Sequence, residues 1–291
     1  MKDNVEDIYP LSPMQAGMLF HSLYDSASRT YFEQMHCALR GKLNVAAFER
    51  AWQKVTERHP ILRTAFVWEG LEEPLQVVQR QVELPLMSFD WRDLSRDQQE
   101  AQLDTFLQAD KAQGFALSQA PLMRLALMQT GADTHYFVWS HHHLLLDGWS
   151  LPLLLQEVFA FYEAHQQGQA IQPESARPYR DYIAWLQERD AAQAESFWRR
   201  TLKGFAAPTP LVVDRKLKDE TEYAVERTRL SAEITSALQS LARAQQVTLS
   251  TILQGAWAIL LHRYSGEEDV VFGATVSGRP ADLPGAETMV G

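Results

Sequence analysis

An apolar stretch from Phe137 to Leu155 holds three consecutive histidines, His141 to His143, and it constrains the fold more than any other part of the chain. Unpaired charge is costly in such apolar surroundings. The residues just before the histidines are aromatic and β-branched, which predicts a strand that leads into them. The sequence therefore predicts a strand that ends in imidazole side chains.

A tight turn and a helix are expected directly after this strand. Asp147-Gly148 is typical of a turn, Ser150 is expected to be the N-cap of the helix, and Pro152 lies in the first helical turn. An imidazole close to a helix N-terminus suits acid–base or dipole-assisted chemistry.

The three histidines are expected to divide between the two faces of the strand. Alternation with period two places His141 and His143 on one face, together with Phe137 and Trp139, and places His142 on the other. Two interpretations other than acid–base chemistry remain. The histidines could be core residues whose polar atoms have hydrogen-bond partners, or the two that share a face could bind a metal ion. Neither a His-Glu-x-x-His helix nor a pair of cysteines supports the metal site, so we predict none.

The spacing His142-His143-x-x-x-Asp147-Gly148 resembles the active-site signature of the condensation domains of nonribosomal peptide synthetases. These domains belong to a wider acyltransferase superfamily that includes chloramphenicol acetyltransferase. Four other segments resemble motifs of the same family, in the same order along the chain. They are Tyr9–His21, Arg58–Phe66, Pro178–Leu186 and Val276–Pro280.

The resemblance implies an α/β fold, an α+β sandwich of two chloramphenicol acetyltransferase-like lobes. Residues 1–172 are expected to form a complete N-terminal lobe. Residues 173–291 are expected to form linker helices and the first part of a C-terminal lobe, with the boundary near the Gln- and Pro-containing stretch 166–178. Family members are longer than 291 residues, so we expect a C-terminally truncated condensation domain.

Capping signals and hydrophobic periodicity predict the individual elements. Helices are expected over residues 13–24, 45–58, 96–113, 179–188 and 192–202, and after the caps Ser231 and Thr248. Strands are expected over residues 31–40, 62–68, 75–82, 123–129, 134–142 and 269–276, with a second α/β segment that begins at Leu211. The single cysteine, Cys37, lies in a predicted strand and is expected to be a buried structural thiol.

Composition excludes several classes of partner. The formal net charge of -10 argues against nucleic acid, because phosphate binding needs a basic face. No stretch approaches eighteen apolar residues, and the first residues hold no apolar segment of a signal peptide. We therefore expect a cytoplasmic protein without a membrane partner.

The family resemblance implies amide-bond formation between two tethered substrates. A donor peptidyl or aminoacyl thioester and an acceptor aminoacyl thioester each hang on a phosphopantetheine arm of a carrier protein, and the acceptor α-amine attacks the donor thioester. The implied partners are an upstream donor carrier, a downstream acceptor carrier and a neighbouring adenylation domain. No cofactor is expected to be bound directly.

The resemblance also assigns roles to single residues. His143 is the catalytic candidate, which orients or deprotonates the amine or donates a hydrogen bond to the tetrahedral intermediate. His142 is expected to be a structural hydrogen-bonding residue, and the family pairs Asp147 with the arginine of the second motif, Arg63. Gly148 is expected to allow close backbone approach, and His141 receives no function.

Local patterns favour the subtype that joins an L-configured donor to an L-configured acceptor. Heterocyclization relatives carry aspartates in place of His142-His143, and epimerization relatives continue differently after Asp147-Gly148. Two other functional classes remain open: a non-catalytic docking or scaffold fragment of a synthetase, and a free-standing acyltransferase that uses a coenzyme A thioester.

Overall fold

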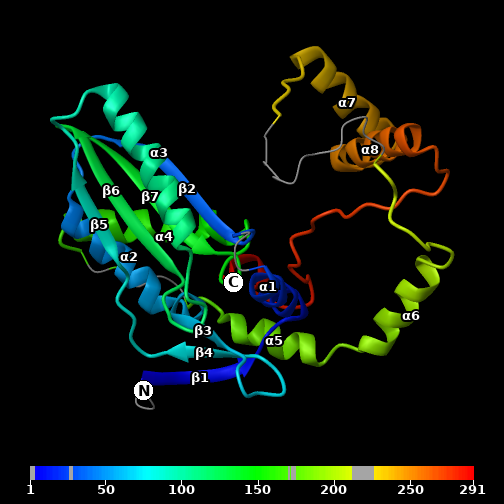
Figure 1. Ribbon diagram of the computed structural model, residues 1–291, viewed down its shortest axis with the longest axis horizontal. Coiled ribbons are helices and arrows are strands. Elements are labelled where there is room, and N and C mark those ends of the chain that lie inside the picture. The colour runs from blue at the N-terminus through cyan, green and yellow to red at the C-terminus, as the bar shows by residue number, and fades with distance from the viewer. Residues whose placement is uncertain (1–3, 26–28, 170, 172–174, 212–225) are drawn as a thin grey trace. The chain divides into compact units, whose positions relative to one another are not determined.

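The computed structural model describes residues 4–25, 29–169, 171, 175–211 and 226–291. The chain divides into two compact units (Figure 1). The first comprises Met1–Arg189 together with Ser277–Gly291, and the second comprises Asp190–Val276. The lobe boundary expected at residue 172 stays a prediction. The second α/β segment was expected to begin at Leu211, and residues 212–225, which follow directly, lie outside the described residues.

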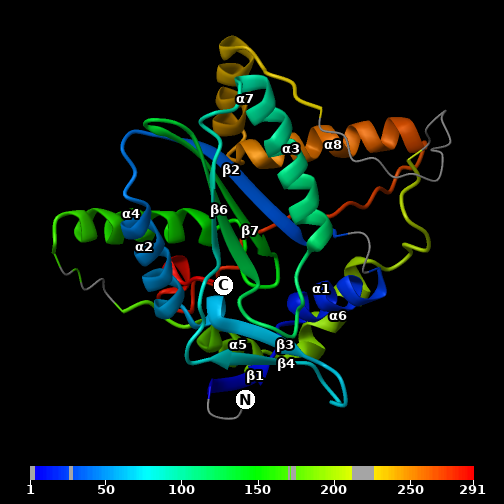
Figure 2. The same cartoon turned by 60° about the vertical axis from the view of Figure 1, so that its left-hand side comes forward.

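The larger sheet of the first unit carries the histidines at the end of one strand. Its order is β2-β7-β6-β5, with β7 paired antiparallel to both neighbours and β5 parallel to β6 (Figure 2). The strands are β2 (Phe32–Arg40), β5 (Leu86–Asp90), β6 (Met123–Gly131) and β7 (Thr134–His142). The predicted hairpin formed by β6 and β7 is therefore confirmed, whereas β5 was missed.

A smaller antiparallel sheet has the order β1-β4-β3. Its strands are β1 (Val5–Pro10), β3 (Thr64–Val67) and β4 (Leu75–Gln79). Strand β1 was not predicted, and the expected strand over residues 62–68 is shorter because Pro60–Arg63 form a 3₁₀ helix, η2. Proline fixes its own φ near the helical range, which favours this tight turn ahead of the strand.

Helices cover both faces of the larger sheet. The first unit contains α1 (Pro13–Tyr24), α2 (Val45–Arg58), α3 (Arg96–Gln113), α4 (Ser150–Gln166), α5 (Tyr179–Gln187) and the 3₁₀ helix η3 (Ala286–Thr288). Phe48 and Trp52 of α2 pack against Phe137 of β7, while Leu103 of α3 belongs to the cluster that contains Val138. Alternate residues of one strand thus enter two cores, as period-two alternation predicts.

Side-chain caps fix the start of the helices where the sequence predicts them. Ser12 and Ser95 each form a capping box, with Gln15 and Gln98 respectively, and Asn44 caps α2. Each cap satisfies backbone N–H groups that have no partner within the helix. These predictions are confirmed.

The second unit contains α6 (Ala191–Thr201), α7 (Ala232–Ala244) and α8 (Leu249–Ser265). Ser231 and Thr248 cap α7 and α8 as predicted. The strand expected over residues 269–276 is wrong: among the described residues this segment pairs with no strand and is mostly exposed. Apolar and β-branched residues favour a strand only where a neighbour completes the ladder and a core covers one face.

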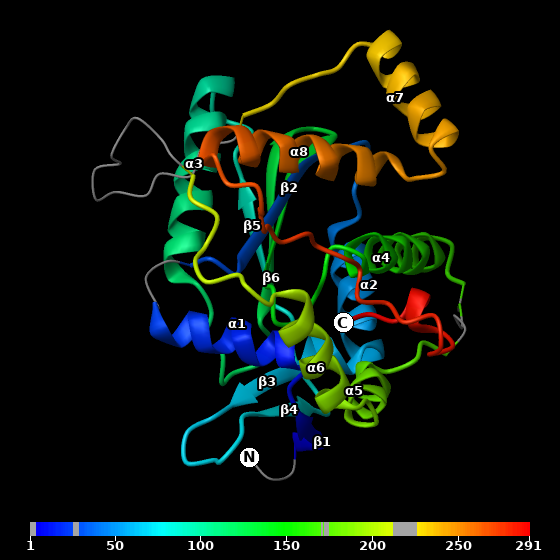
Figure 3. The same ribbon diagram turned by 90° about the vertical axis from the view of Figure 1, so that its right-hand side faces the viewer.

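The chain returns to the first unit after α8. Leu283, Ala286, Met289 and Val290 are buried in the same core as Trp139. Figure 3 shows this last segment in red beside α4. Residues more than a hundred positions apart thus complete one core, and the segment 277–291 is part of the unit that carries the histidines.

Cys37 is exposed, so the prediction of a buried thiol is wrong. Its strand, β2, is an edge strand of the larger sheet, and the consecutive residues His36, Cys37 and Ala38 in the middle of this strand are all exposed. No helix of the described residues is long and apolar enough to cross a membrane.

A buried ion pair joins α3 to the larger sheet. The carboxylate of Asp110 accepts hydrogen bonds from Arg124 of β6, Ser140 of β7 and Gln34 of β2. The side chains of Asp110 and Arg124 are 3% and 10% exposed. Removing one partner of such a pair leaves the other charge buried without compensation.

We expect Asp110→Ala to lower the free energy of unfolding by about 3–5 kcal/mol, because the Arg124 charge loses its counter-ion inside the protein. Urea denaturation measures this. Asp104→Ala, at an exposed position of the same helix, is the control and should change stability by less than about 0.5 kcal/mol. Equal losses in the two variants would contradict the structural role of the pair.

Candidate active site

The histidines lie where β7 ends, and backbone hydrogen bonds hold them on both sides. The N–H of His142 donates to the carbonyl of Leu122 at 2.9 Å, and the N–H of His143 donates to the carbonyl of Tyr31 at 2.9 Å. Tyr31 directly precedes β2, and Leu122 directly precedes β6. The position of the histidine backbone is therefore fixed by the two strands that flank β7.

His141 is a core residue. It is 4% exposed, and its ring packs edge-on against Trp139 with the ring centroids 5.0 Å apart. Burial, with a smaller effect of the neighbouring His143 and His142, lowers its pKa to about 3. His141 is therefore neutral at pH 7 and packs beside Trp139, on the face that alternation predicts.

His142 makes a hydrogen bond within the turn. Its Nδ1 accepts from the backbone N–H of Leu144 at 3.1 Å, so the neutral ring carries its proton on Nε2. Burial, and secondarily the proximity of His143, lowers its pKa to about 4. Tyr31 lies alongside, with the ring centroids 6.3 Å apart.

His143 differs from its two neighbours in that its side chain is only partly buried. Its backbone is fixed through Tyr31, but no described residue accepts from or donates to the imidazole. An imidazole held by its backbone with both ring nitrogens uncommitted can take up a proton or donate a hydrogen bond to a bound substrate. The catalytic role assigned to His143 stays a prediction that this geometry permits.

The turn after the histidines is held by its buried leucine side chains and by a glutamine of α1. Leu144, Leu145 and Leu146 are buried in the main core. Gln15, 3% exposed, donates from Nε2 to the carbonyl of Leu144 at 2.9 Å and to Oε1 of Gln76. The sequence marks Gln15 only as part of a capping box, yet it also connects the segment Tyr9–His21 to the histidine turn.

Asp147 accepts hydrogen bonds from the first residue of α4, whose N-cap position is Trp149 without a side-chain cap. The Oδ1 of Asp147 accepts from the N–H of Ser150 at 2.8 Å and from the Ser150 hydroxyl at 2.6 Å. The prediction that Ser150 is the N-cap is wrong, since Ser150 is the first residue of α4 and is fully buried. A carboxylate at this position satisfies a free N–H group and opposes the positive end of the helix. Pro152 lies in the first turn, as predicted.

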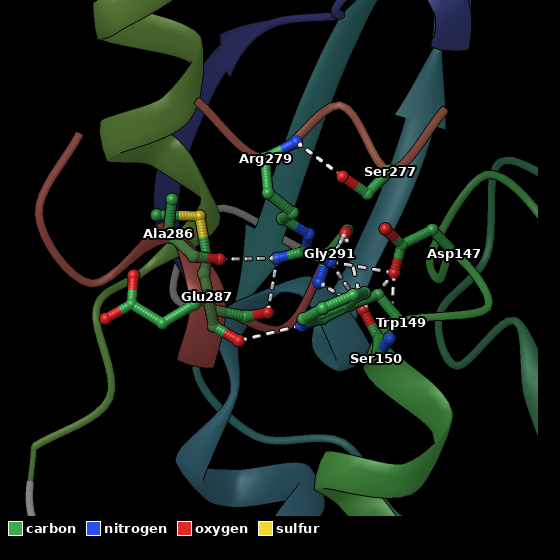
Figure 4. A network of polar contacts seen from close by, with 9 residues as sticks. Asp147, Trp149, Ser150, Ser277, Arg279, Ala286, Glu287 and Gly291 are labelled. Atoms are coloured by element: carbon green, nitrogen blue, oxygen red, sulfur yellow. Dashed lines mark hydrogen bonds and ion pairs between the residues drawn. The ribbon is translucent and has the colours of Figure 1, made fainter. Parts of the chain in front are cut away.

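Arg279 connects the last segment of the chain to this turn (Figure 4). Its Nη2 donates to Oδ1 of Asp147 at 2.7 Å, to the Ser150 hydroxyl at 3.1 Å and to the carbonyl of Gly291 at 2.9 Å. The N–H of Gly291 donates in turn to the Ser150 hydroxyl at 3.1 Å. The Arg279 side chain is 11% exposed, so its charge is compensated mainly by these contacts.

The same arginine also holds the segment that follows it. Its Nη1 donates to the carbonyls of Ala286 and Met289, and the indole N–H of Trp149 donates to the carbonyl of Glu287 at 2.8 Å. These bonds give partners to the carbonyl groups of Glu287 and Met289 and a second partner to that of Ala286, which also accepts from the N–H of Met289.

The expected pair between Asp147 and Arg63 is wrong. Arg63 instead forms an ion pair with Glu6 and donates to the carbonyls of Gln79 and Arg80. It lies at the end of η2, and its Nη1 makes all three of these bonds to Glu6 of β1 and to the end of β4, whereas its Nε is buried without a hydrogen-bond partner. Sequence reasoning missed Arg279, although the lone arginine in Ser277-Gly278-Arg279-Pro280 was the available signal.

Gly148 is exposed, and a Cβ atom at this position would meet nothing within 4 Å. Its φ lies outside the left-handed region. The described residues therefore do not require glycine here, and the expected close approach stays a prediction. Among the described residues, no three His, Cys, Asp or Glu side chains lie close enough to hold a metal ion.

The sequence matches the family model of the condensation domain over residues 5–291. The chain belongs to the condensation domain family. The residues His142-His143-x-x-x-Asp147-Gly148 lie within the matched range, at the end of β7 and in the turn that leads into α4.

Curated relatives resemble this condensation domain along its whole length. It is 48% identical over 295 residues to one of the linear gramicidin synthase proteins of Brevibacillus parabrevis, and 42% identical over 296 residues to bacitracin synthase 3 of Bacillus licheniformis. The two matches cover 99% and 100% of the chain but only 4% of each relative. The chain therefore corresponds to a small part of each of these large synthases.

Solved condensation domains share the fold. The first condensation domain of the calcium-dependent antibiotic synthetase, in complex with a substrate analogue, matches with a TM-score of 0.78 at 21% identity. The match covers 99% of this chain and 68% of that one. The starter condensation domain of rhizomide synthetase matches with a TM-score of 0.79, over 97% of this chain and 63% of its own. The predicted α/β condensation-domain fold is confirmed.

We expect Asp147→Ala and Arg279→Ala to be energetically coupled, because each removes the ion pair that joins the turn to the last segment. Asp147 is about one third exposed, so solvent screening limits the coupling to about 1 kcal/mol. Urea denaturation of both single variants and the double variant measures it. We expect Arg63→Ala to lower stability as well, because it removes the ion pair with Glu6. Its effect and that of Asp147→Ala should add within about 0.5 kcal/mol in the double variant, since the two residues do not interact.

We expect the condensation domain to lose stability in mild acid through its buried histidines. His142 has a pKa of about 4 in the folded protein, and an unfolded histidine has a pKa near 6.5. Below pH 6.5 the unfolded chain therefore binds a proton that the folded chain excludes. The contribution of His142 is fully present above pH 6.5, and about 2 kcal/mol of it is lost between pH 7.5 and pH 5.

Urea denaturation at pH 7.5 and pH 5 tests this expectation. The His142→Asn variant keeps a side-chain oxygen near the position of Nδ1, but this side chain does not ionise. The stability of the variant should therefore change less between the two pH values than that of the parent. His36→Asn, at an exposed position of β2, should show the same loss as the parent. An unchanged pH dependence in His142→Asn would contradict the assignment.

Proposed function

We propose that this condensation domain forms an amide bond in nonribosomal peptide synthesis. The α-amine of an acceptor aminoacyl thioester attacks the carbonyl of a donor peptidyl or aminoacyl thioester, and the donor thiol leaves. The observation that carries the proposal is His143: it belongs to the family signature, its backbone is fixed by Tyr31, and no described residue engages its imidazole.

The proposed reaction requires only limited acid–base assistance from His143. Thioester aminolysis is favourable, and an α-amine with a pKa near 8 is partly unprotonated at neutral pH. Holding the amine and the thioester in line supplies most of the acceleration, because effective molarities in well-oriented reactions reach about 10⁵ M or more. The imidazole orients the amine, accepts its proton, or donates a hydrogen bond to the tetrahedral oxyanion.

The proposal includes tethered substrates and their carriers. The donor and the acceptor each hang on the phosphopantetheine of a carrier protein, next to an adenylation domain, in a cytoplasmic synthetase. The relatives that support this are synthases of linear gramicidin and bacitracin. The preference for L-configured donor and acceptor belongs to the same proposal, and so do the supporting roles of His142, Asp147 and Gly148.

Intact-mass analysis of an acceptor carrier, mixed with a loaded donor carrier and this chain, tests the proposal. We expect the acceptor to gain the mass of the donor acyl group. His143→Ala should lower the rate of this gain by about 10²-fold or more. His36→Ala, at an exposed position of β2, is the matched control and should keep the parent rate.

Equal rates for His143→Ala and the parent would contradict the role of His143. No transfer by any variant, with cognate carriers, would favour the docking or scaffold fragment. Transfer from an acyl-coenzyme A without a carrier protein would favour the free-standing acyltransferase.

A further inference from the structure

Two buried glutamines, Gln15 of α1 and Gln76 of β4, meet between the first helix and the smaller sheet (Figure 3). Their exposed fractions are 3% and 0%. Gln76 lies on the central strand of the smaller sheet, on the same face as Val78, which belongs to the main core. A side-chain amide in such a place destabilises the fold unless its donors and acceptors have partners.

The two amides form a reciprocal pair. Gln15 Nε2 donates to Gln76 Oε1 at 3.1 Å, and Gln76 Nε2 donates to Gln15 Oε1 at 3.0 Å. The second N–H of each amide donates to a backbone carbonyl, that of Leu144 at 2.9 Å and that of Pro10 at 3.0 Å. Gln15 Oε1 also accepts from the N–H of Ser12 at 3.0 Å. All four N–H groups of the pair therefore have acceptors, as a stable buried network requires.

Backbone groups fix the orientation of both amides. A backbone N–H can only donate, and a carbonyl can only accept. Ser12 therefore requires the oxygen of Gln15 on its side, and Leu144 requires the nitrogen. The carbonyl of Pro10 likewise requires the nitrogen of Gln76. Neither amide can turn over without losing hydrogen bonds, so the pair presents one fixed donor to the histidine turn.

That donor holds the peptide groups around His143 from another element of the fold. Within the turn, the N–H of Leu144 donates to His142 Nδ1 at 3.1 Å, and the N–H of Leu145 donates to the carbonyl of His142 at 3.0 Å. These two bonds fix the internal shape of the turn. The bond from Gln15 to the carbonyl of Leu144 instead fixes where the turn lies relative to α1 and the smaller sheet.

We infer that the amide pair of Gln15 and Gln76 is a positioning unit for His143. Gln76 orients Gln15, and Gln15 holds the turn through the carbonyl of Leu144. Both act through the backbone of the turn rather than on a substrate. The inference rests on the proposed function, in which the imidazole must lie within hydrogen-bond reach of the reacting amine.

The rate of amide formation by Gln15→Met, Gln76→Met and the double variant tests the pair. Methionine has a similar length but no amide. We expect Gln15→Met to lower kcat about tenfold or more and to leave KM for the loaded acceptor carrier within about twofold, because small displacements at a reacting centre cost rate. Thermal unfolding checks that each variant is folded at the assay temperature.

The double variant shows whether the two glutamines act as one unit. Gln76 acts on the turn only through Gln15, so the double variant should be no slower than Gln15→Met alone. Rate losses that multiply in the double variant would mean that the two side chains act independently, and this result overturns the pair as a unit.

Gln98→Met is the matched control. Gln98 holds the equivalent capping-box position in α3, is exposed, and accepts from the N–H of Ser95 at 2.9 Å. The variant loses the same type of capping bond but no bond to the histidine turn. It should therefore keep the parent kcat. A loss of kcat as large as that of Gln15→Met would overturn the inference.

Amide hydrogen exchange measured by NMR provides a readout without turnover. The N–H of Leu145 belongs to the peptide group whose carbonyl Gln15 holds. Gln15→Met should speed its exchange about tenfold or more. The N–H of Leu125, which donates to the carbonyl of Pro85 at 2.9 Å, should change less. Equal acceleration at both positions would indicate general destabilisation and would overturn the positioning role.

The outcomes separate the positioning unit from the proposed reaction. Parent kcat in folded Gln15→Met overturns the positioning unit even where the chain forms amide bonds. Where the parent forms no amide bond with cognate carriers, the proposed function fails, and exchange at Leu145 then decides alone. Faster exchange confined to the turn supports the hold of Gln15 on it, and unchanged exchange overturns that hold.

Discussion

The ion pair between Asp147 and Arg279 is the contact on which the geometry of the site depends. It joins a turn in the middle of the sequence to the last segment of the chain, across 132 positions. Asp147 also accepts from the first N–H group of α4, and Arg279 also donates to three backbone carbonyls. A change at either residue therefore affects the turn, the helix start and the packing of η3 together. Charge-assisted hydrogen bonds to several acceptors suit such a junction, because the arginine fork fixes direction as well as distance.

Local signals in the sequence predicted most helices of the first unit and its β6–β7 hairpin, whereas the long-range partner of Asp147 was predicted wrongly. Each capping box, at Ser12 and at Ser95, consists of only four consecutive residues and is enough to predict where a helix starts. The β6–β7 hairpin is likewise predicted from two neighbouring apolar segments and the turn between them. Nothing local distinguishes Arg63 from Arg279 as the partner of Asp147. That choice depends on the smaller sheet, which gives Arg63 three acceptors of its own.

The three histidines show how position alone separates chemically identical side chains. His141 points toward the aromatic core at Trp139, and His142 is tied to Leu144; burial keeps both neutral. His143, one residue further, lies beyond the strand end and is only partly buried. Alternation along β7 predicts the first two environments. The uncommitted imidazole of His143 depends on where the strand stops, which the hydrogen bond to Tyr31 determines.

The proposed amide formation would depend mainly on rigid support around His143. Thioester aminolysis is favourable and an α-amine is partly neutral at pH 7, so a site for this reaction needs mainly to hold the amine and the thioester in line. An error of about 1 Å in such a site can cost 10²-fold in rate. The backbone bonds to Tyr31 and Leu122, the buried leucines and the hydrogen bonds from Ser150 to Asp147 all restrict that movement.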